Sequence, residues 1–204
     1  MATVADVLSF SRAQAQTDSN GLTNANGIIF ANEALLDYRR RLIAAGVDAS
    51  QVQEAYTDMT TDVGTYLYPT DMFWLKAIEL NYADQSAQNY ITAAQLDVSN
   101  TPAQASFSFI RKNADANLPQ FDDRGDWFEI FPTPTTTNTQ GIRIIYFLEP
   151  TEYTATSDTI AYPESLDYRI LGWRIASSYY KALNKFEEAM GFDVEYEKKV
   201  KDII

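Results

Sequence analysis

The segment 126–190 decides the fold that this sequence predicts. It holds two apolar runs, WFEIF at 127–131 and IRIIYFL at 142–148, followed by an amphipathic stretch that Pro163 opens. Runs rich in aromatic and β-branched residues favour strands, so we expect the two runs to pair as a hairpin. The later stretch has apolar residues on two neighbouring helical stripes, which predicts a helix covered on two sides. Pro163 suits its first turn and Gly191 its C-terminal cap, so the helix should span about 163–190.

Two helices are predicted before these elements. Thr3, with Asp6 three residues later, forms a capping-box pattern, and the apolar spacing that follows it is helical. Thr23 or Asn24 can cap a second helix, which Gly46 ends. The N-terminal part of the chain should therefore contribute two amphipathic helices.

In the middle of the chain, apolar residues mostly recur at every second position. Residues 52–56 and 66–68 predict the two strands of a hairpin, and 75–82 predicts a third strand with one exposed face. Residues 91–98 are a candidate short helix, and 107–110 should be extended. Together with the helices, these patterns indicate an α+β protein.

Composition excludes several classes of function. The 204 residues include 16 basic and 28 acidic side chains, a net charge of −12, with no cysteine and no histidine. The charge opposes nonspecific binding to nucleic acid, which depends on Lys and Arg. Without Cys and His there are no disulfides, thiolate nucleophiles or imidazole acid–base groups, and we expect neither cofactor nor metal. A basic leader and a membrane span are also lacking, so we expect an unprocessed protein in a cytosol-like environment.

Two segments are candidates for contact with other chains. The loop 132–141 is Thr-rich and stiffened by proline, and it lacks apolar residues for a core of its own, so we expect it to project. Beyond Gly191, Asp193 can cap a last helix, which would be a separable tail suited to docking. We therefore expect one domain over 1–190 and a docking segment over 191–204. The residues concerned are Pro132, Thr133, Pro134, Thr135, Thr136 and Asn138 in the loop, and Tyr196, Val200, Ile203 and Ile204 in the tail.

Three segments occur in an order that is typical of a known family. YLYPTDM at 66–72 leads into a strand, FPTP at 131–134 leads through the loop into IIYF at 144–147, and YPE at 162–164 opens the long helix. In this order they resemble the head-to-tail connector, or adaptor, proteins of tailed bacteriophages, which form a ring beneath the portal. Tyr68 stands where that family has leucine. The resemblance spans most of residues 3–190 and rests on the order of the segments.

The resemblance implies a mainly helical α+β fold, in which a helical bundle carries an inserted β-hairpin or small antiparallel sheet and an extended C-terminal segment. It implies a structural virion protein without enzymatic activity, assembled in the host cytoplasm and located in the neck between capsid and tail. Its implied partners are further copies in a ring, twelvefold to match the portal, together with the portal protein and a tail or nozzle protein. DNA would pass through the lumen without specific binding, and no membrane is involved. The C-terminal residues would contact the portal, and the loop would face the tail.

An enzyme and a carbohydrate-binding module are the alternatives. Neighbouring strands could bring two carboxylates together for glycan hydrolysis. Exposed Tyr and Trp side chains could bind sugars, although each Trp lies in an apolar pattern that favours the core. The candidate carboxylate pairs are Glu129 with Glu149 and Asp126 with Glu152, and the three tryptophans are Trp74, Trp127 and Trp173.

Three short motifs are interpreted as structural. Residues 124–126 spell Arg-Gly-Asp, an integrin-binding tripeptide, but Gly and Asp are common turn residues. The aspartates at 122, 123 and 126 lack the spacing of a calcium loop with its distal Glu. The Arg39–Arg41 run lies on a predicted helix that also carries acidic residues, so we expect a solvated face.

Overall fold

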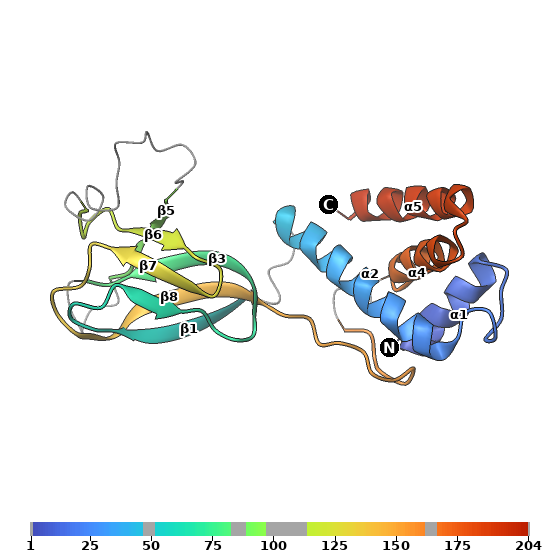
Figure 1. Cartoon of the computed structure of the whole chain (residues 1–204), viewed down its shortest axis with the longest axis horizontal. Helices are drawn as coiled ribbons and strands as arrows, with labels where there is room; N and C mark the ends of the chain where they lie inside the picture. The colour runs from blue at the N-terminus through green and yellow to red at the C-terminus, as the bar shows by residue number, and fades with distance from the viewer. Residues whose placement is uncertain (1, 47–51, 83–88, 97–113, 162–166, 204) are drawn as a thin grey trace. The chain divides into compact units, whose positions relative to one another are not determined.

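The computed structural model describes residues 2–46, 52–82, 89–96, 114–161 and 167–203. The chain folds into two compact units, drawn as ribbons in Figure 1. The helical unit comprises Met1–Ser50 and Pro150–Ile204, and the sheet unit comprises Gln51–Glu149. The sheet unit is therefore an insertion into the sequence of the helical unit.

The two N-terminal helices begin where the sequence predicts. The Thr3 hydroxyl accepts a hydrogen bond from the Asp6 amide, and the Asp6 carboxylate accepts one from the Thr3 amide at 2.7 Å, which completes the capping box. Thr23 caps the second helix, and Gly46 follows it with a left-handed φ of 71°. The described helices are α1 (Val4–Gln14), α2 (Asn24–Ala44), α4 (Arg169–Ala182) and α5 (Phe186–Lys201).

All four described helices contribute to one apolar core. In Figure 1, α4 lies among α1, α2 and α5, and it contacts all three. The segment that follows the sheet unit is fastened to this bundle, because the Asn32 carboxamide exchanges two hydrogen bonds with the backbone of Tyr153 at 3.0 and 2.8 Å. The buried core residues are Val4, Val7, Leu8, Leu22, Ala31, Ala34, Leu35, Tyr38, Leu42, Tyr153, Ile160, Ile170, Leu171, Ile175, Tyr196 and Val200.

The single long helix predicted over about 163–190 is wrong in its extent. Pro163 lies outside the described residues, and the described part of the stretch forms two helices, α4 and α5. They separate at Asn184, whose φ of 58° is left-handed, a conformation that asparagine tolerates better than most residues. α5 then passes through Gly191 without ending, so this glycine is not a cap and the predicted domain boundary at 190 falls within a helix.

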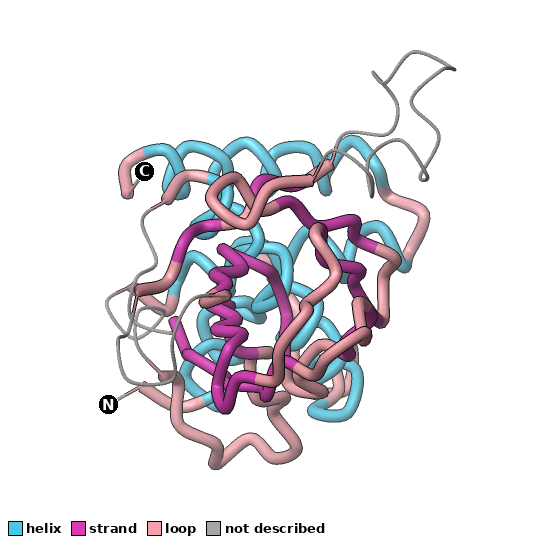
Figure 2. Tube along the Cα trace, turned by 90° about the vertical axis from the view of Figure 1, so that its left-hand side faces the viewer, coloured by secondary structure: helices cyan, strands magenta, loops and turns pink. Residues whose placement is uncertain are grey.

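The strands lie in the sheet unit, where they form two four-stranded sheets. The strand orders are β1-β8-β3-β4 and β2-β7-β6-β5, and all described pairings are antiparallel except that of β5 with β6. Figure 2 draws the strands in magenta. The strands are β1 (Val52–Met59), β2 (Thr65–Leu67), β3 (Met72–Leu80), β4 (Ile91–Thr92), β5 (Ala94–Gln95), β6 (Gln120–Asp123), β7 (Trp127–Phe131) and β8 (Asn138–Leu148).

The mainly helical fold implied by the family resemblance is wrong. Helices account for 37% of the residues and strands for 28%, and the strands build two sheets instead of one small hairpin. The hairpin expected between 127–131 and 142–148 does not form, because β7 pairs with β2 and β6 while β8 pairs with β1 and β3. The connection between β7 and β8 therefore crosses from one sheet to the other.

The other local predictions are partly confirmed and partly wrong. The strand predicted over 75–82 is confirmed as β3, whereas β1 and β2 belong to different sheets and form no hairpin. The candidate helix over 91–98 is wrong, because its described residues include the short strands β4 and β5. The extended segment expected at 107–110 lies outside the described residues.

The two sheets bury their facing sides in one core, which makes the unit a sandwich. Ile144 of β8 and Phe128 of β7 are both buried there, although they belong to different sheets. Along β7, Phe128 and Ile130 are buried while Trp127 and Glu129 between and beside them are partly exposed, as expected for a strand with one face in the core. The buried core residues are Met59, Tyr66, Tyr68, Ile78, Leu80, Ala93, Phe121, Phe128, Ile130, Ile142, Ile144 and Tyr146.

Candidate functional site

The tail residues predicted to dock on another chain differ in how far they are buried. Tyr196 and Val200 are 0% and 2% exposed and belong to the core of the helical unit. Ile203 is 39% exposed, and Ile204 lies outside the described residues. The inner face of α5 therefore holds the helix on its own unit, and the outer face is the one that another chain can reach.

The outer face of α5 carries an apolar stripe that sequence reasoning missed. Its members are 47% to 65% exposed. Three of them recur at every fourth residue, a spacing that places them along one side of a helix. Ending the predicted helix at residue 190 divided the stripe between two elements and hid this signal. The residues, which we call the outer stripe, are Leu183, just after α4, and Phe186, Met190 and Val194 of α5.

A polar network lies beneath the inner face of α5. The Asp193 carboxylate accepts hydrogen bonds from Arg174 at 2.8 Å, Ser177 at 2.7 Å and Lys181 at 2.7 Å, all three on α4. The Tyr196 hydroxyl donates to the Asp37 carboxylate on α2 at 2.9 Å. α5 is thus fixed in position by charge-assisted bonds as well as by apolar contacts.

Arginines from two helices flank the buried tyrosine. The Arg41 and Arg174 guanidinium carbons lie 5.3 and 5.5 Å from the centre of the Tyr196 ring. Arg41 also bonds Glu197 of α5 at 2.8 Å. Burial and the adjacent Asp37 carboxylate raise the pKa of the Tyr196 hydroxyl far above its ordinary range, so this hydroxyl remains a donor. The Arg39–Arg41 run is accordingly not one solvated face, since Arg39 is buried, Arg41 is half-buried and Arg40 is exposed.

The network predicts a specific sensitivity to acid. Burial alone raises the pKa of the Asp193 carboxyl, but the bonds and charges of Lys181, Ser177 and Arg174 outweigh burial and lower the pKa below its ordinary value. The stabilisation from a lowered pKa is present above the unfolded value of about 3.9 and is lost as the pH falls through the folded value. We expect Asp193→Asn to lower the free energy of unfolding at pH 7 by about 1–3 kcal/mol.

The same variant should lose less stability than the wild type between pH 5 and pH 3, measured by urea unfolding at each pH. Asp202→Asn is the matched control, because Asp202 is exposed just beyond the end of α5. Equal acid sensitivity of wild type and Asp193→Asn would contradict a lowered pKa of the Asp193 carboxyl in the folded protein.

The predicted projecting loop is only partly exposed. Pro134 and Asn138 are buried, Pro132 and Thr133 are half-buried, and the exposed tip includes Thr135 and Thr136. The Pro134 carbonyl accepts a hydrogen bond from the Asp62 amide at 2.9 Å, and the buried Asn138 carboxamide donates to the Asn81 carbonyl at 2.8 Å. Both ends of the loop are therefore anchored in the sheet unit.

The carboxylate pairs considered for glycan hydrolysis have no support in the strand pairing. Glu129 lies on β7 and Glu149 follows β8, and these strands belong to different sheets. Asp126 and Glu152 belong to different units. Among the described residues, no three Asp or Glu side chains gather in a way that could hold a metal ion. Within the Arg-Gly-Asp motif, Gly125 has a φ of 89°, which is consistent with the predicted turn.

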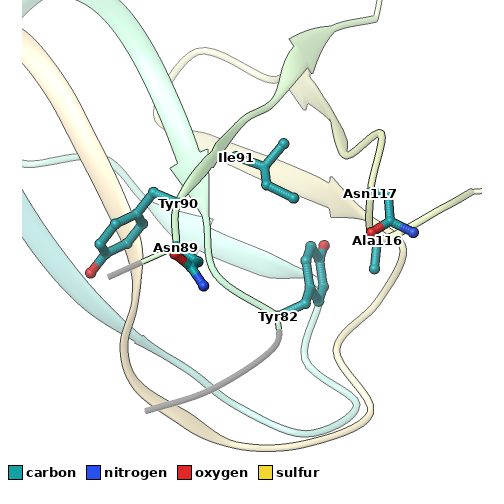
Figure 3. A pocket seen from close by; sticks show the side chains of 6 residues that line it. All are labelled: Tyr82, Asn89, Tyr90, Ile91, Ala116 and Asn117. Carbon is teal, nitrogen blue, oxygen red and sulfur yellow. The ribbon is translucent and has the colours of Figure 1, made fainter. Parts of the chain in front are cut away.

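The places where a small ligand could bind are exposed aromatic side chains and one hollow in the sheet unit. Trp74 is half exposed, so its predicted place in the core is wrong, whereas Trp173 packs against the helical core. A hollow of about 360 Å³ lies in the sheet unit, where Asn89 and Asn117 flank the Tyr82 ring (Figure 3). The Tyr82 hydroxyl already donates to the Pro132 carbonyl at 2.6 Å, and the described residues that line the hollow carry no charge. We assign this hollow no chemistry.

The helices that the structure describes include none with both the length and the apolar character needed to cross a membrane. In a comparison with known protein families, the model described as SU10 adaptor protein matches residues 2–203. No curated protein matches the chain.

Proposed function

Because this chain belongs to the SU10 adaptor protein family, we propose that it is a structural bacteriophage protein that joins the portal to the tail as a ring of identical copies. The family match over 2–203 is the observation that carries this proposal. The absence of Cys and His from the sequence favours a structural role over a catalytic one. The ring would occupy the neck of the virion and match the twelvefold order of the portal.

The charge distribution supports a DNA channel in such a ring. Residues 51–149, the sheet unit, carry 13 acidic and 5 basic side chains and so account for most of the net charge of −12. Acidic surfaces repel the phosphate backbone and allow DNA to slide without sticking. DNA would therefore pass through the lumen without specific contacts.

The proposed portal anchor is the outer stripe, which replaces the docking residues expected within 191–204, since only Val194 of the stripe belongs to that segment. Phe186, Met190 and Val194 are exposed, whereas Tyr196 and Val200 stabilise the helical unit itself. One copy of so small a stripe binds weakly, but repetition around a ring raises the effective concentration and gives a stable joint. The exposed loop tip at Thr135 and Thr136 is the proposed tail contact.

The test mixes the purified chain with its portal and then with the tail protein, and it images the products by electron microscopy. We expect portal-bound rings with the wild type and loss of attachment with Met190→Asp plus Val194→Asp, which change the outer face only. The control Ile29→Asp introduces a single aspartate at an exposed site on α2 and should attach normally. Attachment of the α5 variant at unchanged occupancy would place the anchor elsewhere, and absence of any ring would overturn the proposed function.

A further inference from the structure

We propose that two copies of the chain pair before assembly through α5 in antiparallel orientation, so that each copy covers the outer stripe of the other. The pairing itself does not depend on the proposed function. Only its consequence does, namely that the covered surface is the one that later meets the portal. A paired chain could not attach until the pair separates.

The apolar part of the contact is the outer stripe. Phe186, Met190 and Val194 are each more than 60% exposed, while Ala189 on the inner face of the same helix is 0% exposed. α5 therefore has one face used within its own unit and, beside it, a face with apolar side chains open to water. A contiguous exposed apolar surface marks an interaction site more often than chance exposure does.

Charge identifies a second copy as the occupant. The first turn of α5 is acidic, with Glu187 and Glu188, and its last turn is basic, with Lys198, Lys199 and Lys201. Glu187 and Lys198 are separated by about three turns at 3.6 residues per turn, so they lie on the same flank of the stripe. Around a twofold axis, antiparallel helices place equal flanks against each other. Glu187 of each copy would therefore meet Lys198 of the other.

Gly191 provides an independent argument for this orientation. A side-chain carbon added at this position would have no atom within 4 Å, so no packing within the chain requires a glycine inside α5. Glycine inside a helix weakens the helix, and its presence there needs a packing reason. At 3.6 residues per turn, Gly191 lies on the same flank of α5 as Glu187 and Lys198. The bare position would leave room on that flank for the charged side chains of the facing copy.

The pair should be weak and reversible. A single helix stripe is small compared with the roughly 1,600 Å² buried in a stable interface, so the pair should form only at high protein concentration. Such a contact can be displaced by a multivalent partner that competes for the same face. Weak pairing therefore suits a temporary cover for an assembly surface.

The test is sedimentation equilibrium of the full chain over a wide range of concentration. We expect a monomer–dimer equilibrium in which Met190→Asp weakens pairing about a hundredfold, because the twofold axis counts each substitution twice. Lys198→Glu should weaken pairing about tenfold, since two ion pairs become repulsive contacts. Glu187→Lys combined with Lys198→Glu should restore wild-type pairing, and Ile29→Asp should leave it unchanged.

The outcomes separate this proposal from the proposed function. A chain that stays monomeric at all concentrations, or a double variant in which pairing is not restored, overturns the antiparallel pair. Larger closed oligomers with the same dependence on α5 also overturn it, because they require a head-to-tail contact. If pairing follows the expected pattern but the portal binds the dimer as well as the monomer, the pair stands and the outer stripe is not the portal anchor.

Discussion

Replacing Tyr196 with alanine is expected to destabilise the helical unit by about 3–5 kcal/mol, the range for removing a large buried aromatic side chain. The ring is fully buried between α5 and its neighbours, and its hydroxyl is bonded to Asp37. Its removal leaves a cavity and two arginines, Arg41 and Arg174, without the ring that they flank. Losses of this size are comparable with the whole stability of a small domain.

Hydrogen exchange measured by mass spectrometry can test this expectation region by region. Protection should fall in α2, α4 and α5 while the strands of the sheet unit keep theirs. Tyr196→Phe is the control, since it keeps the packing and removes one hydrogen bond, at a cost of about 0.5–1.5 kcal/mol. If the alanine variant melts like the phenylalanine variant, Tyr196 does not support the core as described.

Adding a leucine side chain at Gly172 should cost about 3 kcal/mol, at the upper end of the range for overpacked sites. A Cβ at this position would lie only 2.4 Å from Cδ1 of Phe10, because α1 and α4 cross closely there. The Phe10 ring cannot move freely, since it packs edge-on against Trp173 with ring centres 5.3 Å apart. The Ser11 hydroxyl also donates to the Gly172 carbonyl at 3.1 Å.

Gly191→Leu is the matched comparison, because it makes the same replacement in a helix where the side chain meets open space. It should stabilise the monomer by about 0.8–1 kcal/mol through helix propensity alone. Thermal unfolding at low protein concentration would compare the two variants. Changes of the same sign would contradict the packing described for the α1–α4 crossing.

Local signals in the sequence predicted local structure well. The Thr3 and Asp6 capping box and the Thr23 cap fix the starts of α1 and α2 through bonds between residues only three apart. β7 matches its predicted range because its composition favours a strand wherever its partners lie. The resemblance to phage adaptor proteins, drawn from the order of three segments, is confirmed by the family match.

Strand pairing could not be predicted in the same way. The alternating apolar pattern of a strand identifies which of its residues share a face. Several partner strands, however, fit the same alternating pattern. β8 pairs with β1 and β3, more than 60 residues away in the sequence, instead of with β7 beside it. The assumption that neighbouring strands pair predicted a hairpin of β7 and β8, whereas the two strands belong to different sheets.

The exposed face of α5 could not be predicted from the sequence. The sequence identified the C-terminal segment as amphipathic, yet Tyr196 and Val200 proved to face inward. An apolar stripe does not say which side of a helix faces its own unit when both sides carry apolar residues. Only the positions of Asp37, Arg41 and Arg174 around Tyr196 settle which face is which.

The insertion of the sheet unit between the two parts of the helical unit has a consequence for synthesis on the ribosome. α1 and α2 emerge first, but α4, which both of them contact, begins 125 residues after α2 ends. At about 5–20 residues per second, the two helices wait roughly 6–25 seconds with their apolar faces uncovered. The sheet unit is contiguous in sequence, so it can fold during this delay. We therefore expect the sheet unit of the nascent chain to fold before the helical unit. Until α4 leaves the ribosome, α1 and α2 should need protection from aggregation.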